Sequence, residues 1–143
     1  KKVIKELMDD GVVVIAVGGG GIPVIKEDRI KLLEGTEAVI DKDRSAALLA
    51  KEIDADILLI LTSVDKVYIN YNKENAQALD SINEEEAKRY IAEGQFAEGS
   101  MLPKIEACLE FISNNSSKKA IIGSLEKARE AINGSSGTVI KAK

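Results

Sequence analysis

The sequence predicts an α/β fold with three layers, αβα, in which a mainly parallel, open sheet is the middle layer. Three observations favour this fold class. Apolar runs of strand length alternate with helical patterns, the runs are aliphatic, and aromatic residues make up only 3% of the chain. Aliphatic runs without polar alternation are typical of parallel strands buried on both faces. Right-handed crossovers between such strands place helices on both sides of the sheet.

The first elements are predicted from apolar patterns and glycines. Residues 2–10 are expected to form a helix with Gly11 as its C-cap. Residues 12–17 are six consecutive apolar residues and are predicted to form the first buried strand. Four glycines follow at residues 18–21. Residues 26–37 are mostly polar, and we interpret them as an excursion from the sheet with the character of a hairpin.

The middle of the chain continues the alternation of helix and strand. Apolar residues recur at helical spacing over residues 43–53, which predicts a helix with Asp43 as its N-cap. Residues 57–61 are predicted to be the second buried strand. The polar loop that follows is expected to hold short strands at residues 67–69 and 78–82.

The remaining elements are predicted mainly from helix caps. Asn83 and Glu86 have the spacing of a capping box, which predicts a helix to about Ala92. Ser100 is expected to cap the next helix, with Pro103 in its first turn, where a missing N–H is harmless. The last predicted elements are a strand at residues 119–122, a helix at 124–132 and a strand at 138–140.

Length and composition limit the function. The 143 residues fit one domain, and we interpret residues 1–143 as a single nucleotide-binding domain or a fragment of a longer kinase, because the chain starts at Lys1 within a helical pattern. The net charge of -4 argues against a nucleic-acid surface, and no apolar run is long enough for a membrane span. The absence of histidine excludes histidine-based catalysis and histidine-ligated metals, and we predict no protein metal site. The single cysteine, Cys108, favours a reducing compartment.

The glycine run follows a predicted buried strand. Glycines allow backbone N–H groups to approach an anion closely, so residues 18–21 are a candidate phosphate or substrate loop. No Gly-Lys-Ser/Thr follows, which excludes a P-loop, and Pro23 breaks the dinucleotide-binding spacing. A glycine-rich turn without function is the alternative.

Two further stretches place charged residues at predicted helix starts. Asp41, Lys42 and Asp43 precede one helix, and Lys104 lies in the first turn of another. Lysine is unfavourable against the helix dipole at this end, so an anion nearby would explain Lys104. A lysine beside a carboxylate that orients it suits phosphoryl transfer, which depends on positioning and on charge stabilisation. A cap at Asp43 and a solvated lysine at Lys104 are the simpler alternatives.

The loop after the second predicted strand carries candidate nucleotide contacts. Thr62 and Ser63 can donate hydrogen bonds to a phosphate or ribose, and Tyr68 can cover an adenine face. A polar loop with one packed tyrosine is equally compatible with the pattern. Cys108 lies on the apolar face of its predicted helix and is interpreted as a core residue.

Taken together, these segments resemble the carbamate kinases within the amino-acid-kinase fold. The resemblance covers nearly the whole chain and is carried, in family order, by Ile15–Val24, Glu37–Asp43, Leu61–Tyr68, Glu86–Tyr90 and Gly99–Ala107. It implies reversible phosphate transfer from carbamoyl phosphate to ADP, which yields carbamate and ATP, with Mg2+ accompanying the nucleotide.

The resemblance also implies roles for individual residues. Lys42 and Lys104 would contact the transferring phosphate, and Asp43 would orient them. Gly19 and Gly20 would border the carbamate site. The expected nucleotide-binding residues are Thr62, Ser63, Asp65, Tyr68, Ser100, Met101 and Pro103.

The family is about twice as long as this chain. The resemblance implies that the amino-terminal half is missing, with a Gly-Gly-Asn-Ala loop and a further lysine, so little or no kinase activity is expected from this chain alone. It also implies a cytoplasmic homodimer that acts in arginine metabolism. A non-catalytic nucleotide-binding or regulatory module of the same fold is the main alternative, and a dinucleotide-dependent oxidoreductase is disfavoured by Pro23.

Overall fold

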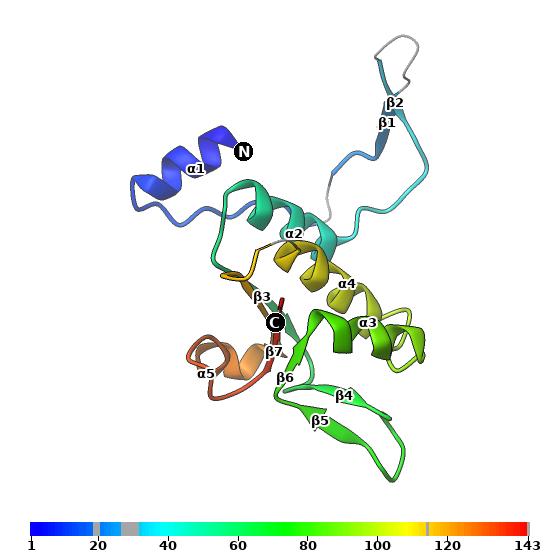
Figure 1. Ribbon diagram of the computed structural model, residues 1–143. Helices are drawn as coiled ribbons and strands as arrows, with labels where there is room; N and C mark the ends of the chain where they lie inside the picture. The colour runs from blue at the N-terminus through cyan, green and yellow to red at the C-terminus, as the bar shows by residue number, and fades with distance from the viewer. Residues whose placement is uncertain (19–20, 27–31, 114, 143) are drawn as a thin grey trace.

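The computed structural model describes residues 1–18, 21–26, 32–113 and 115–142 (Figure 1). The helices are α1 (Lys2–Asp9), α2 (Lys42–Glu52), α3 (Glu84–Ala92), α4 (Met101–Ile112), the 3-10 helix η1 (Leu125–Lys127) and α5 (Ala128–Ile132). The strands are β1 (Val24–Lys26), β2 (Leu33–Gly35), β3 (Ile57–Thr62), β4 (Val67–Ile69), β5 (Gln77–Leu79), β6 (Ser81–Asn83), β7 (Lys119–Ser124) and β8 (Thr138–Lys141).

A four-stranded sheet in the order β3-β7-β8-β6 forms the centre of the molecule. The pairs β3–β7 and β6–β8 are parallel, as predicted, whereas β7–β8 is antiparallel. This pair departs from the expected parallel crossover because the chain leaves β7, makes the short η1 and α5, and returns from the same end, with Ile122 opposite Thr138. Gly137 has a φ of 83° in the returning turn, a conformation that favours glycine.

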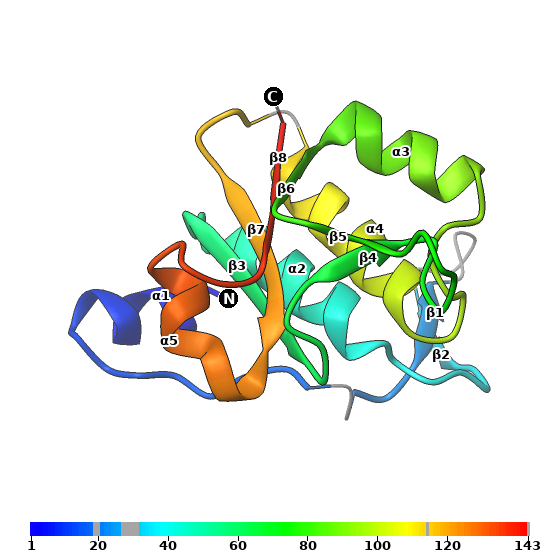
Figure 2. The same cartoon turned by 90° about the horizontal axis from the view of Figure 1, so that it is seen from below.

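Helices cover both faces of this sheet, so the predicted αβα layering is confirmed. In Figure 2, α2, α4 and α3 lie on one side of the sheet and α5 lies on the other. The α4 helix is the main core helix, and its residues Ile105, Cys108 and Ile112 are fully buried. The core is mainly aliphatic, as the composition predicted, with Phe96 and Phe111 as buried aromatic residues. Burying an apolar side chain of this size contributes roughly 1.5–3 kcal/mol.

The amino-terminal helix ends one residue earlier than predicted, with Asp10 rather than Gly11 as its C-cap. The strand predicted after it is wrong. The α1 helix closes with Gly11 at a φ of 79°, and the amides of Gly11 and Val12 donate to the carbonyls of Met8 and Leu7. Residues 12–17, however, form no strand. Ile15 is 99% exposed. A strand needs a partner ladder for its backbone groups, and β3 pairs with β7 rather than with this segment.

Helix α2 begins differently from the prediction. Asp41, not Asp43, is its N-cap, since the Asp41 carboxylate accepts a 2.8 Å hydrogen bond from the Arg44 amide. The helix therefore starts one residue earlier, at Lys42. Asp43 then falls in the first turn and is buried against α4, which leaves its carboxylate available for another partner.

The other predicted caps have mixed outcomes. Asn83 and Glu86 form the expected reciprocal capping box at α3. Ser100 occupies the N-cap position of α4, but its side chain makes no capping hydrogen bond. The last predicted helix begins as the 3-10 helix η1 before α5, and Ser124 makes no cap bond there.

Two antiparallel hairpins extend from the layers. Strands β1 and β2 pair as a hairpin that begins at Val24, two residues before the predicted excursion. Strands β4 and β5 pair in the loop after β3. The β4–β5 hairpin is a separate two-stranded sheet in Figure 1. In the part of the chain that the structure describes, no helix combines the length and apolar character needed to cross a bilayer.

Candidate functional site

A cavity of about 380 Å3 lies where the first turn of α4 faces the loop after β3 and the β4–β5 hairpin. Parallel β3 ends at this edge, so its last residue and the following loop supply one wall. The lining residues are Thr62, Ser63, Val64, Lys66, Tyr68, Asn70, Tyr71, Lys73, Gly94, Gln95, Phe96, Ala97, Ser100, Met101 and Lys104.

Lys104 is the least exposed of the charged groups that line this cavity. Its Nζ donates a 2.7 Å hydrogen bond to Oδ2 of Asp43, which projects from the first turn of α2. The two side chains are only 12% and 11% exposed. A largely desolvated ion pair holds its partners more firmly than a surface pair, because water competes less for each charge. The packing of α2 on α4 therefore fixes the position of one ammonium group at the cavity wall.

Two more lysines line the same cavity. Lys66 follows β3 and forms an ion pair with Asp80, and Lys73 lies in the turn between β4 and β5. Among the described residues that line the cavity, none is an aspartate or glutamate. The charged side chains of the lining are therefore lysines, although Lys66 and Lys104 are each paired with an aspartate outside the lining. A lining of this kind favours an anionic ligand.

The hairpin supplies an aromatic side to the cavity. The rings of Tyr68 and Tyr71 lie with their centroids 5.9 Å apart and their planes tilted by 59°. The far end of β4 is held by Gln95, whose Oε1 accepts a 2.9 Å hydrogen bond from the Asn70 amide. Aromatic faces on one side and ammonium groups on another suit a ligand with a planar base and a phosphate chain.

The structure brings together most of the residues that the sequence predicted for nucleotide binding. The residues predicted for nucleotide binding that line this one cavity are Thr62, Ser63, Tyr68, Ser100 and Met101. Lys104, which was predicted to be catalytic, lines it as well. These residues come from two separate stretches of the chain, one running from the end of β3 into β4 and the other at the start of α4. The predicted catalytic pair Asp43 and Lys104 is in direct contact.

Other predicted site residues lie elsewhere. Asp65 does not line the cavity but forms a 2.5 Å ion pair with Lys127, which lowers the pKa of the Asp65 carboxyl. Lys42 is exposed and is not part of the cavity lining. Gly19 and Gly20 lie outside the described residues.

Pro103 lines a different hollow, formed between α2 and α4. This hollow, of about 660 Å3, is larger than the first cavity, and its lining residues are Val39, Ile40, Asp41, Arg44, Ser45, Leu48, Pro103 and Glu110. Its cation, Arg44, already donates to Glu106 at 2.8 Å, and this contact raises the pKa of Arg44. The smaller cavity is the better candidate site because it gathers several lysines and aromatic rings.

Several lining residues were missed by the sequence interpretation. Lys66, Tyr71 and Lys73 belong to a polar loop in which lysines and tyrosines are interleaved, and that pattern was visible in the sequence. Gln95 and Phe96 carry no such signal, because they come from the connection between α3 and α4, whose position depends on the packing of both helices.

The side chains that the structure describes do not provide the ligands that a protein metal site needs. Within residues 1–18, 21–26, 32–113 and 115–142, no group of three or more cysteines, aspartates and glutamates could hold a metal ion. The cavity offers hydroxyl oxygens at Thr62 and Ser63 but no carboxylate. The described residues therefore form no dedicated cage for magnesium, an ion that is commonly bound through substrate phosphates and water.

One buried thiol lies directly behind the Asp43–Lys104 pair. Cys108 is fully buried on the same face of α4 as Lys104, one turn further along. Burial raises the pKa of the Cys108 thiol, and the nearby Asp43 carboxylate acts in the same direction. This thiol is a neutral packing group, as the sequence indicated, and not a nucleophile.

Curated relatives with similar sequences are carbamate kinases. The carbamate kinase of Clostridium perfringens is 56% identical over 141 residues, which cover 98% of this chain and 44% of that protein. The carbamate kinase-like protein YqeA of Escherichia coli is 54% identical over 140 residues, which cover 98% and 44%. The chain thus spans less than half the length of these relatives. The resemblance to the carbamate kinases inferred from the sequence is confirmed.

The fold and the family agree with these relatives. The carbamate kinase from Giardia lamblia bound to AMP-PNP matches with a TM-score of 0.90 and 44% identity, over 99% of this chain and 49% of that chain. This similarity confirms the predicted α/β fold. The amino acid kinase family matches residues 1–124, which are most of the sequence. The chain therefore belongs to the amino acid kinase family.

Proposed function

We propose that this chain supplies the ADP/ATP-binding part of a carbamate kinase, an enzyme that transfers phosphate reversibly from carbamoyl phosphate to ADP. The observation that carries the proposal is the Asp43–Lys104 pair at the wall of a cationic, tyrosine-lined cavity. The relatives named above support the reaction class, and the solved relative from Giardia lamblia binds an ATP analogue.

The nucleotide has a natural orientation in this cavity. The base would lie toward Tyr68 and Tyr71, and the phosphates toward Lys104 and the first turn of α4. The partial positive charge of a helix N-terminus favours an anion there. Lys66 and Lys73 would neutralise the outer phosphate oxygens between these two ends.

Lys104 would act by stabilising charge rather than by moving a proton. As phosphate leaves carbamoyl phosphate and reaches ADP, negative charge spreads over the transferring oxygens, and a fixed ammonium group stabilises it. Asp43 would hold Lys104 in place, so that little reorganisation is needed during the transfer. Lys42, exposed in the first turn of α2, would contact the same phosphate from the substrate side. No histidine or other acid–base residue is required.

Magnesium, when it accompanies the nucleotide, supplies charge neutralisation at the phosphates. Since the cavity lining has no carboxylate, the phosphate oxygens themselves would hold the ion, with Thr62 or Ser63 as the hydroxyl donors in reach of the site. The chain's own lysines would carry the rest of the neutralisation.

The substrate side of the active site would belong to the part of the relatives that this chain does not span. We therefore propose that the exposed apolar residues of segment 12–17 pack against that part, and that the chain alone has little kinase activity. We propose further that the complete enzyme is a cytoplasmic homodimer. Sedimentation of a full-length protein would test the dimer.

Nucleotide binding can be tested on this chain directly. Calorimetry with ADP and Mg2+ should show binding by the wild type, and Lys104→Met should weaken it on the order of tenfold or more, because a charge-assisted contact is lost. Lys88→Met on α3 is the matched control, since Lys88 is exposed and paired with Glu84 away from the cavity. Equal affinities in all three proteins would contradict the proposal, provided circular dichroism shows each to be folded.

Catalysis can be tested with a chimera. This chain would replace the matching segment of the Clostridium perfringens carbamate kinase, and ATP formation from carbamoyl phosphate and ADP would be followed in a coupled assay. The chimera should be active, the isolated chain should not, and Lys104→Met should abolish the activity of the chimera. Enzyme-like turnover by the isolated chain would refute the proposed division of the site.

A non-catalytic nucleotide-binding or regulatory module remains the second candidate. One observation favours it: the chain holds the lysine- and tyrosine-lined cavity, yet it covers only 44% of the length of its carbamate kinase relatives. In this case the chain would bind ADP, but the folded chimera would form no ATP. The same two experiments therefore separate the two functions.

A further inference from the structure

The β4–β5 hairpin contributes a large share of the candidate nucleotide site. Lys66, Tyr68, Tyr71 and Lys73 all come from the segment that leads into β4 and turns toward β5. A two-stranded sheet of this size is marginally stable on its own in water. The positions of these side chains at the cavity thus depend on what holds the hairpin against the rest of the fold.

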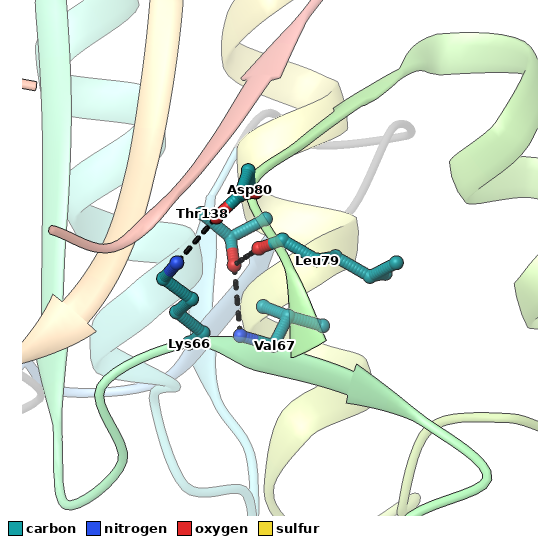
Figure 3. A network of polar contacts seen from close by, with 5 residues as sticks. All are labelled: Lys66, Val67, Leu79, Asp80 and Thr138. Carbon is teal, nitrogen blue, oxygen red and sulfur yellow. Dashed lines mark hydrogen bonds and ion pairs between the residues drawn. The ribbon is translucent and has the colours of Figure 1, made fainter. Parts of the chain in front are cut away.

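A single buried hydroxyl joins the two strands at the base of the hairpin. Thr138, the first residue of β8, is 0% exposed. Its Oγ1 accepts a 2.8 Å hydrogen bond from the Val67 amide and donates to the Leu79 carbonyl. Val67 and Leu79 are directly opposite in the β4–β5 ladder, so Thr138 bridges the pair (Figure 3).

Two further contacts strengthen this base. The Val139 amide donates to the Asp80 carbonyl at 3.0 Å, which links the residue after β5 to β8. Lys66 forms its ion pair with Asp80 beside Thr138, as Figure 3 shows. The hairpin is thus tied to the central sheet at the point where its cavity-lining residues begin.

The backbone before Thr138 leaves little freedom for this hydroxyl. Gly137 has a φ of 83°, and a Cβ there would meet Cγ2 of Ile121 at 3.0 Å and the Ile122 carbonyl oxygen at 3.1 Å. The close approach of Gly137 to β7 fixes where β8 starts and therefore where the Thr138 side chain lies.

We propose that Thr138 is a positioning residue for the nucleotide site, because its hydroxyl fixes the hairpin that presents Lys66, Tyr68 and the Tyr71 turn to the ligand. The proposal rests on the function proposed above. Thr138 touches no part of the cavity itself, and it lies beyond residues 1–124 that match the family. Its effect on ligand binding passes through Val67 and Leu79.

Three variants separate a positioning role from general stability. Thr138→Val removes the hydroxyl with little change in shape, Thr138→Ser keeps the hydroxyl, and Ile140→Val trims a fully buried side chain on the same strand without touching the hairpin bonds. Hydrogen exchange at the Val67 amide reports on the hairpin, and calorimetry with ADP and Mg2+ reports on the site.

Thr138→Val should lose roughly tenfold or more of the exchange protection at Val67 and roughly tenfold in ADP affinity, because two buried backbone groups lose their partner. Thr138→Ser should restore both to within about twofold, and Ile140→Val should lower the melting temperature while leaving ADP affinity within about twofold. An ADP affinity equal to that of the wild type in Thr138→Val, or an equal loss of ADP affinity in Ile140→Val, would overturn the positioning role. Either result would leave the proposed function standing. Failure of the wild-type chain to bind ADP would overturn the proposed function, and this role with it.

Discussion

Residues 1–41 and residues 42–142 have similarly apolar sequence patterns, yet they differ in packing. Every buried residue that the structure describes lies in the second region. In the first region, Val13, Ile15 and Val39 are each more than 90% exposed. The contrast between segment 12–17 and β3 is the clearest case, because both are apolar runs of strand length, but only β3 has a neighbouring strand, β7. An apolar run thus becomes a strand only where a partner completes its ladder.

The largest expected effect is on the free energy of unfolding, which should respond differently to substitutions in the two regions. Phe111→Ala, at a residue only 1% exposed in α4, should lower the free energy of unfolding by about 3–5 kcal/mol. Ile15→Ala, at a residue 99% exposed, should change it by less than about 0.5 kcal/mol. Urea denaturation followed by far-UV circular dichroism measures both. A large loss in Ile15→Ala would show that segment 12–17 is packed, and would break the comparison.

Ile15→Ala can also be tested in the chimera proposed above, where segment 12–17 would have a partner. If segment 12–17 packs against the part of the carbamate kinases that this chain does not span, Ile15→Ala should cost about 2–5 kcal/mol there. The measurement is again urea denaturation, with Phe111→Ala as the reference in both proteins. An Ile15→Ala chimera as stable as its parent would count against that packing.

The next prediction tests whether Asp43 and Lys104, the ion pair of the packed region, depend on each other for stability. Asp43→Asn should destabilise the chain by about 1–3 kcal/mol, because it leaves the Lys104 ammonium nearly buried without its counter-charge. Asp43→Asn combined with Lys104→Met should cost less than the sum of the single variants. A double-mutant cycle from urea denaturation gives the coupling, and additive losses would show that the two side chains act independently.

Parts of the fold and site that depend on local chemistry could be predicted. The α3 capping box and the burial of Cys108 follow from neighbouring residues, and these predictions are confirmed. Gly11 follows the end of α1 as a left-handed glycine, although Asp10 and not Gly11 is the C-cap. Asp41 and Asp43 show the limit, since either could cap α2 and only the burial of Asp43 against α4 decides between them. Gln95, Phe96 and Thr138 could not be predicted as contributors to the site, because each acts through packing between distant segments.

A smaller effect is expected in the reactivity of thiols placed in the two regions. Because burial raises its pKa, the Cys108 thiol should stay neutral and react slowly with a disulfide reagent at pH 8, whereas a thiol introduced by Ile15→Cys should react at the rate of a free thiol. The folded state favours the neutral form. The contribution of Cys108 to the free energy of unfolding should therefore be fully present below the pKa of an unfolded thiol, about 8.5. It should decline as pH rises above that value. Rapid labelling of Cys108 in native conditions would contradict this assignment.

The smallest expected effect concerns an ion pair that joins the two regions. Lys1 lowers the pKa of the Glu52 carboxyl at the end of α2, but both side chains are exposed, so the pair should hold residues 1–41 only weakly. Because the folded pKa of Glu52 is depressed, the contribution should be present above the unfolded value of about 4.3 and lost as pH falls through the folded pKa. An NMR titration should show Glu52 below its ordinary pKa, and Lys1→Ala should return it upward with little change in the melting temperature. A large drop in that temperature would mean that contacts between the regions, and not the core of the second region alone, stabilise the chain.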